Sequence, residues 1–167
     1  MTSSNVYLLR QGLDLLNQLD DELYVRVLPE VTQAGIGAHL RHCLDFYGAF
    51  LSGIGQGKVN YDMRERNELI ETNRFRASSK IIEAIAQLQL LPANEPDKEL
   101  LVKLEGEQVG NASVWSRSSI RRELQFLLSH TVHHYALISV LMRMQGIQPA
   151  ADFGIAPSTL KYWQANA

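Results

Sequence analysis

The chain is poor in several features that would assign it to a specialised class of protein. Its single cysteine, Cys43, cannot form an intramolecular disulfide, which favours a reducing compartment. No apolar run approaches the roughly 20 residues needed to cross a bilayer. A net charge of −2 provides no basic surface for nucleic acid. The N-terminal residues lack a basic segment followed by an apolar stretch. We therefore expect a cytoplasmic protein with no nucleic-acid or membrane partner.

The rest of the composition is that of one globular domain. The chain has 167 residues, of which 46% are hydrophobic and 20% are charged, a balance typical of soluble folded proteins. A chain of this length buries a sizeable core. Because no internal repeat, low-complexity stretch or linker divides it, residues 1–167 are interpreted as a single domain.

Apolar residues recur at helical spacing in four parts of the chain. These segments are 6–19, 32–51, 74–91 and 119–145. Thr32 and Ser119 are the expected N-caps of the second and fourth segments, and Gly146 stands where a left-handed residue would end the last one. The pattern predicts an all-α fold, a four-helix bundle.

Three other segments depart from helical spacing. Residues 58–73 are charged and predict a long connection between the second and third helices. Residues 100–115 alternate between apolar and polar side chains around Gly106 and Gly110, which predicts a small β-hairpin before the last long helix. In the C-terminal tail, we expect the aromatic side chains of Tyr162 and Trp163 to dock on the bundle.

All five histidines lie in two clusters, on the second and fourth predicted helices. The first cluster contains His39 and His42, and the second contains His130, His133 and His134. Residues four apart on a helix differ by only about 40° in direction, so His130 and His134 share one face. A third ligand would come from the second helix. Three neutral imidazoles with an open fourth position form a site for a divalent transition metal such as Zn, Ni or Fe.

Spacing alone leaves open both the presence of a metal and the identity of its ligands. A histidine on a helix is commonly a structural polar residue, and pairs four residues apart also arise by chance. The apolar periodicity of the second helix favours His39 over His42 as the inward-facing residue. His133 also lies within one turn of His130, so the pattern permits more than one triad.

The segments that carry the histidines resemble those of a known family. The matching residues are GIGAHLRH at 35–42 and HTVHH at 130–134. They are similar to the DinB-like (DinB/YfiT-like) family of metal-binding four-helix proteins. In that family, one histidine of the second helix and an H-x-x-x-H pair of a late helix hold the metal. The resemblance covers most of the chain, and it implies His42, His130 and His134 as the ligands.

The resemblance also implies properties of the whole molecule. Family members are often dimeric, hold the metal near one end of the bundle, and include transferases and isomerases that use low-molecular-weight thiols. We therefore expect a homodimer that acts on a small-molecule substrate with the help of such a thiol. Members often carry glycine and glutamine soon after the last histidine, where this chain has Tyr135, Ala136 and Leu137. This departure leaves the reaction unassigned.

Residues next to the expected ligands have two interpretations each. Asp45 lies three residues after His42, where it either orients a ligand histidine or forms an exposed ion pair with Arg41. His39 and His133 are likewise candidates for orienting a ligand or for structural polar roles. All three are therefore candidates for a supporting position around the metal.

Cys43 and the arginines of the long connection also carry reactive or charged groups. Cys43 falls within the apolar stripe of its helix, so we expect it in the core. Arg64 and Arg66 could bind an anionic substrate. Three glutamates lie close to them in the sequence, however, and favour a self-paired network on the surface.

These patterns predict a metal-dependent enzyme of the thiol-dependent transferase or hydrolase type. A metal held by three imidazoles lowers the pKa of a bound thiol or water. The alternative is a non-catalytic, stress-related protein that binds a metal or a small ligand, and a purely structural metal is the third hypothesis. The sequence identifies no catalytic acid or base.

Overall fold

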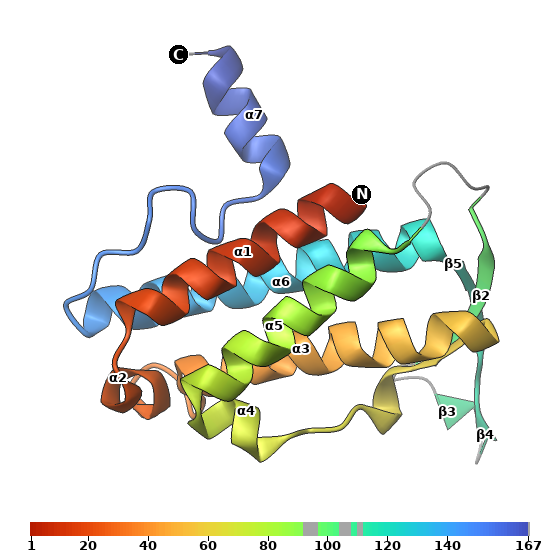
Figure 1. Cartoon of the computed structure of the whole chain (residues 1–167), viewed down its shortest axis with the longest axis horizontal. Coiled ribbons are helices and arrows are strands. Elements are labelled where there is room, and N and C mark those ends of the chain that lie inside the picture. The colour runs from red at the N-terminus through yellow and green to blue at the C-terminus, as the bar shows by residue number, and fades with distance from the viewer. Residues whose placement is uncertain (92–96, 104–107, 110–111, 167) are drawn as a thin grey trace.

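Four long helices form the body of the molecule in the computed structural model (Figure 1), which describes residues 1–91, 97–103, 108–109 and 112–166. They are α1 (Thr2–Gln18), α3 (Ile36–Gly53), α5 (Arg74–Gln89) and α6 (Ile120–Met144). Helices α1 and α3 each pack against both α5 and α6, so the four helices close into a bundle. The predicted four-helix bundle is confirmed. Two short helices, α2 (Asp21–Val25) and α4 (Glu68–Thr72), pack against each other and against α3.

Local signals at the helix ends explain where the histidine-bearing helices begin and stop. The Ser119 hydroxyl accepts a hydrogen bond from a backbone N–H of the first turn of α6, as an N-cap does. Gly146 has φ of 80° just after α6, which satisfies the expected left-handed end. The prediction that Thr32 caps α3 was wrong. Helix α3 begins after Gly35, and the Thr32 hydroxyl accepts a hydrogen bond within the preceding loop.

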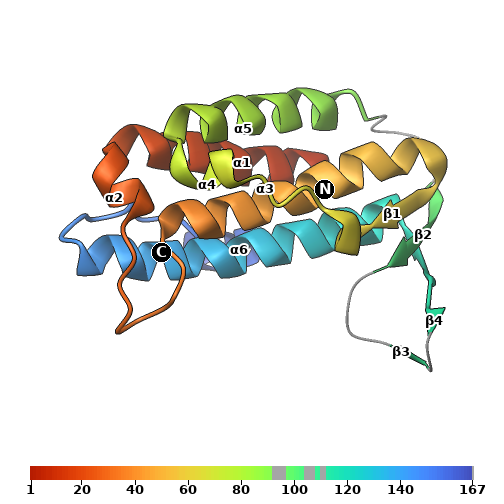
Figure 2. The same cartoon turned by 90° about the horizontal axis from the view of Figure 1, so that it is seen from below.

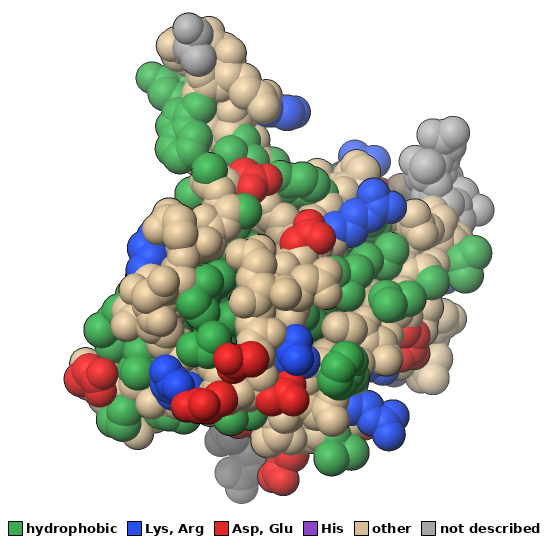
Figure 3. All heavy atoms as spheres, turned by 60° about the vertical axis from the view of Figure 1, so that its left-hand side comes forward, with side chains coloured by type: hydrophobic (Ala, Val, Ile, Leu, Met, Phe, Trp, Pro, Cys, Tyr) green, Lys and Arg blue, Asp and Glu red, His purple; other side chains and the backbone are tan. Residues whose placement is uncertain are grey.

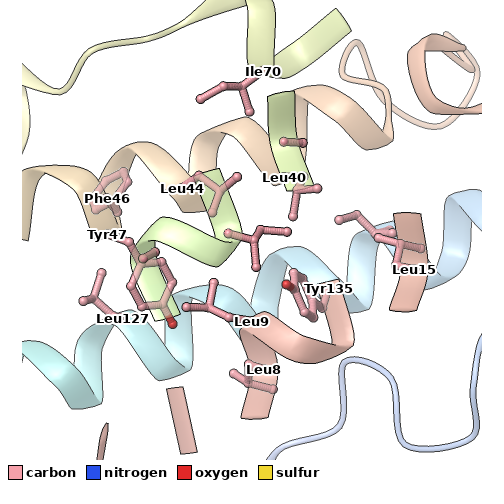
Figure 4. Close-up of a cluster of buried hydrophobic side chains, with 14 of the residues drawn as sticks. Leu8, Leu9, Leu15, Leu40, Leu44, Phe46, Tyr47, Ile70, Leu127 and Tyr135 are labelled. Carbon is pink, nitrogen blue, oxygen red and sulfur yellow. The ribbon is translucent and has the colours of Figure 1, made fainter. Parts of the chain in front are cut away.

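The core lies where the four helices face one another (Figure 4). Its largest members are leucines at helical spacing together with tyrosines. They include Leu8, Leu9 and Leu15 on α1, Leu40, Leu44 and Tyr47 on α3, and Leu127 and Tyr135 on α6. Burying one leucine side chain stabilises the fold by about 1.5–3 kcal/mol. This core therefore holds α3 firmly against α6. Cys43 is buried as expected.

The two long insertions meet in a small sheet at one end of the bundle (Figure 2). Strand β1 (Lys58–Asn60) pairs in parallel with β2 (Glu99–Lys103), and β2 pairs antiparallel with β5 (Ser116–Ser119). A separate short pair consists of β3 (Gln108–Val109) and β4 (Ala112–Ser113). The predicted β insertion is confirmed. Its sheet is larger than expected because β1 comes from the charged connection, which shows no alternation. Gly106 and Gly110 lie outside the described residues.

The C-terminal tail does not dock on the bundle through its last aromatic residues, contrary to expectation. Helix α7 (Pro157–Ala165) has no buried residue and projects from the body of the molecule (Figure 1, Figure 3). Tyr162 and Trp163 are 67% and 50% exposed. The tail packs into the core through Phe153 instead, whose ring stacks on Tyr135 with 4.7 Å between centroids.

Candidate metal centre

Three histidine rings converge between α3 and α6, the two helices that the core holds side by side. The Nε2 atoms of His42 and His130 are 3.2 Å apart. The centroid of the His134 ring lies 4.7 Å from that of His42 and 4.6 Å from that of His130. One nitrogen from each ring lies within 4.8 Å of the other two. Within the described ranges, these three residues form the cluster that could hold a metal ion.

The spacing of the nitrogens fits a single small cation. Zn–N bonds of about 2.0–2.1 Å at the tetrahedral angle place two ligand nitrogens about 3.3 Å apart. The 3.2 Å between the Nε2 atoms of His42 and His130 is close to that value. A donor set of three imidazole nitrogens suits Zn, Ni or Fe. The cluster consists of the same three residues that the family resemblance implied.

The other two histidines lie beside this cluster in different surroundings. His39 is only 8% exposed, and its Nδ1 lies 3.0 Å from Nδ1 of His134. His133 is exposed, and its ring meets that of His134 edge-on with 5.1 Å between centroids. Periodicity is therefore right that His39 is buried. The ring of His39 nevertheless contacts a candidate ligand instead of joining the cluster.

Burial and nearby positive charge keep the clustered imidazoles neutral. Desolvation is the main cause that lowers the pKa of His42 and of His130 to about 4, and that of His134 to about 3. The positive charge of Arg64 lowers the pKa of His42 and His130 further, and Arg41 acts in the same direction on His42. Neutral imidazole is the form that binds a metal. The cluster is therefore ready to bind a cation at neutral pH.

The lowered pKa values make the metal-free fold sensitive to acid. A histidine of the unfolded chain has a pKa near 6.5, so between about pH 6.5 and pH 4 the unfolded chain binds more protons than the folded one. Stability is therefore lost as the pH falls through this window. We expect the urea midpoint of the metal-free protein to decrease between about pH 7 and pH 5, and to decrease less steeply in the His130→Gln variant. If the urea midpoint decreased equally with pH in both proteins, the lowered pKa of His130 would not be a cause of the acid sensitivity.

Aromatic side chains cover one side of the cluster. The ring centroid of Phe46 lies 4.4 Å from that of His130 and 5.0 Å from that of His42. The ring of Tyr61, which directly follows β1, stacks on Phe46 at 5.1 Å. The Tyr61 hydroxyl donates a 2.7 Å hydrogen bond to Oε2 of Glu123, which is 1% exposed. The buried carboxylate of Glu123 on α6 thus holds Tyr61, in the connection between α3 and α5, beside the histidines.

Sequence analysis did not single out Phe46 or Glu123. Phe46 has no distinguishing signal, because one more apolar residue on an apolar helix indicates only core packing. Glu123 does carry a signal that could have been used. It shares the inward face of α6 with Leu127, four residues later, and an acid at such a position indicates a buried hydrogen-bond partner.

Asp45 forms an ion pair with Arg41, which is one of the two roles that the sequence left open for it. The Oδ2 atom of Asp45 is 3.0 Å from Nη1 of Arg41, and Nη2 of Arg41 is 3.1 Å from Oε2 of Glu71. Asp45 is 4% exposed, so the pair is largely buried and not exposed as expected. Burial raises the pKa of Asp45, while the hydrogen bond and charge of Arg41 lower it. Among the described residues, no histidine hydrogen-bonds to this carboxylate.

Comparisons with known proteins add a family and one distant relative. The chain is 31% identical over 104 residues to FK506-binding protein 5 of Rhizopus delemar (strain RA 99-880 / ATCC MYA-4621 / FGSC 9543 / NRRL 43880). The matched stretch is 62% of this chain but only 27% of that protein, so the likeness concerns a part of the relative. No solved structure gives a significant match. In the part of the chain that the structure describes, no helix has both the length and the apolar character to cross a membrane.

The family model covers nearly the whole chain. The match to the DinB family runs from residue 2 to residue 163 and so includes all four long helices, the inserted sheet and every histidine. It agrees with the resemblance carried by the two histidine segments and with the helical fold that surrounds them. The chain belongs to the DinB family.

Proposed function

We propose that this chain is a metal-dependent enzyme in which His42, His130 and His134 bind one divalent transition metal, Zn, Ni or Fe. The observation that carries the proposal is the convergence of one nitrogen from each ring to within 4.8 Å of the others. The low pKa values of the rings support it, because all three imidazoles are neutral at neutral pH and each keeps one nitrogen lone pair that can bind a metal.

His39 is proposed to hold the ring of His134 in place. Their Nδ1 atoms are 3.0 Å apart, and such a contact needs one nitrogen to donate and the other to accept. A proton on Nδ1 of His134 leaves the lone pair on its Nε2 free for a metal. His39 would then accept the hydrogen bond, as the partners of metal-binding histidines do. His133 is exposed and has no comparable hydrogen bond among the described residues, so it receives no such role.

The surroundings of the cluster favour an anionic ligand at the metal. When bound, a divalent metal lowers the pKa of a coordinated thiol or water to near neutrality and makes it a nucleophile. The guanidinium groups of Arg64 and Arg41 add positive charge near His42. Phe46 and Tyr61 cover one side of the cluster with apolar surface, which shields it from water. The two guanidinium groups stabilise a negatively charged thiolate or hydroxide, and the exclusion of water strengthens their effect.

Transfer of a low-molecular-weight thiol to a small electrophile is the reaction we favour, with hydrolysis by a bound water second. The choice of a thiol follows from the DinB family, which includes thiol-dependent transferases. A non-catalytic binding protein is the alternative, because no general acid or base is assigned among the described residues. The phenol of Tyr61 donates a hydrogen bond to Glu123. A homodimer and a cytoplasmic location stay predictions.

A thiol-transfer assay with and without metal tests the enzyme hypothesis. The purified protein would be stripped of metal, reloaded with Zn, Ni or Fe, and mixed with glutathione and chlorodinitrobenzene. In this reaction the thiolate sulfur bonds to the ring carbon and chloride leaves. We expect at least one loaded form to exceed the metal-free protein in rate by more than about tenfold, and the His130→Ala variant to lose the gain. Firm metal binding without any gain across a panel of thiols and electrophiles would favour the non-catalytic alternative.

A further inference from the structure

Arg64 lies next to the histidine cluster, separated from it by one aromatic ring. Its Cζ atom is 5.1 Å from the centroid of Phe46, and the same ring lies 4.4 Å from His130 between centroids. The backbone explains this placement, because Nη1 of Arg64 donates a 2.8 Å hydrogen bond to the carbonyl oxygen of Tyr61. Since Tyr61 is fixed by the stacked Phe46 and the buried Glu123, the guanidinium is held in a set position.

The guanidinium of Arg64 has unused donors. Its Nε is buried with no hydrogen-bond partner, and Arg64 forms no ion pair within the described ranges. A buried donor without a partner destabilises the fold, and more strongly when it is charged. Such a group is expected to have a partner that completes it.

Two of the three glutamates that were expected to neutralise this loop have other partners. Glu71 pairs with Arg41, and Glu65 accepts a hydrogen bond from the side-chain amide of Asn67. The self-paired surface network that the sequence favours does not include Arg64 in the described structure. Its guanidinium instead lies over the ring of Phe46, which contacts the rings of His130 and His42.

We propose that Arg64 is a specificity-determining residue that binds the carboxylate of a small thiol whose sulfur coordinates the metal held by the three histidines. A guanidinium binds a carboxylate through paired charge-assisted hydrogen bonds, and Arg64 has donors left for them. The inference rests on the proposed function, because it needs a metal in the cluster. It deepens that function by naming the substrate class, a thiol that also carries a carboxylate.

The test compares two thiols of the same length, one that ends in a carboxylate and one that ends in a neutral hydroxyl. The wild-type protein is loaded with Co²⁺, and mercaptopropionate or the neutral mercaptopropanol is titrated in while the thiolate-to-cobalt absorption band is recorded. A charged hydrogen bond contributes about 1.5–3 kcal/mol, so we expect mercaptopropionate to bind at least about tenfold more tightly. In the Arg64→Gln variant the ratio of the two affinities should fall to about one, because the loss of charge near the metal weakens both thiolates alike and the carboxylate alone loses its partner.

Matched variants separate the role of Arg64 from a general loss of charge or fold. Arg66→Gln removes the same charge from an exposed position two residues away, and we expect it to keep the preference for mercaptopropionate. Arg64→Lys keeps the charge but not the planar fork and should retain only part of the preference. If Arg64→Gln does not fold, Arg64→Lys is the variant in which the affinities for the two thiols are compared.

The outcomes distinguish this inference from the proposed function. Equal affinity of the two thiols for the cobalt-loaded wild type would overturn the role of Arg64 and leave the metal site standing. A preference that survives in Arg64→Gln, or disappears equally in Arg66→Gln, would also overturn it. Failure of the wild type to bind cobalt would overturn both proposals.

Discussion

Replacing His130 by alanine is expected to abolish stoichiometric metal binding. His130 lies close to both other members of the cluster, with its Nε2 3.2 Å from that of His42 and its ring centroid 4.6 Å from that of His134. Loss of a partner that only orients a ligand already costs about 10–100-fold in affinity, and loss of a ligand removes more. Elemental analysis of purified, dialysed protein should therefore show about one metal per wild-type chain and almost none in His130→Ala. The same result is expected for His42→Ala and His134→Ala.

The remaining histidines provide the controls within the same two helices. His133→Ala is expected to retain full occupancy because the side chain is exposed and outside the cluster. His39→Ala should also retain the metal, but with affinity lowered by about tenfold because His134 loses the partner of its Nδ1. Full occupancy in all three variants of the cluster would show that these residues do not bind the metal.

Replacing Gly37 by alanine is expected to destabilise the fold by about 3 kcal/mol. Gly37 lies in the first turn of α3, and a Cβ there would overlap the backbone carbonyl oxygen of Glu71 and lie 2.9 Å from Cε1 of Tyr24. The obstacle is backbone, so no side-chain rotation relieves it. Helix α4 would have to move away from α3, which weakens the Arg41–Glu71 ion pair as well. Urea unfolding of the metal-free protein measures the loss.

Gly48 is the matched control for this substitution because it lies in the same helix. A Cβ at Gly48 meets nothing within 4 Å, and alanine is the better helix former by about 0.8–1 kcal/mol. Gly48→Ala should therefore be neutral or stabilising. If the Gly37→Ala and Gly48→Ala proteins were equally stable, α4 would not pack as closely on α3 as described.

The long helices could be predicted from sequence because their signals are local. Apolar spacing and the cap at Ser119 determine α6 without reference to the rest of the chain. The start of α3 could not be found in the same way. Thr32 has the chemistry of an N-cap, but the chain turns into the helix only at Gly35, where α2 leaves too little room for a side chain. Glycine at that position reflects a tertiary contact and not a local preference.

The parallel strand β1 and the exposed helix α7 could not be predicted, because their own residues carry no local signal for them. Three residues of β1 are too few for an alternating pattern, and their pairing partner lies about forty residues later in β2. Tyr162 and Trp163 have the apolar character of docking residues, yet what they contact depends on the path of the tail after Phe153. Neither outcome is encoded within the segment itself.

The candidate site could be predicted from helical spacing only in part. Helical spacing placed His130 and His134 on one face, but it could not choose between His39 and His42. That choice depends on how α3 is rotated against α6, which the packing of the whole bundle determines. The family resemblance selected His42, and the distances agree with it. The partners of Arg64, by contrast, depend on a loop whose charged sequence permits several pairings.

The X-ray absorption spectrum of the zinc-loaded protein tests the metal site most directly, because it reports the atoms bound to the ion. We expect three imidazole nitrogens at about 2.0–2.1 Å, with a fourth ligand that is an oxygen of solvent or the sulfur of a thiol. His130→Ala should take up almost no zinc, and any zinc that it does hold should be bound by fewer than three imidazole nitrogens. A zinc ion surrounded mainly by oxygen atoms, or bound by a single imidazole, would contradict the three-histidine site.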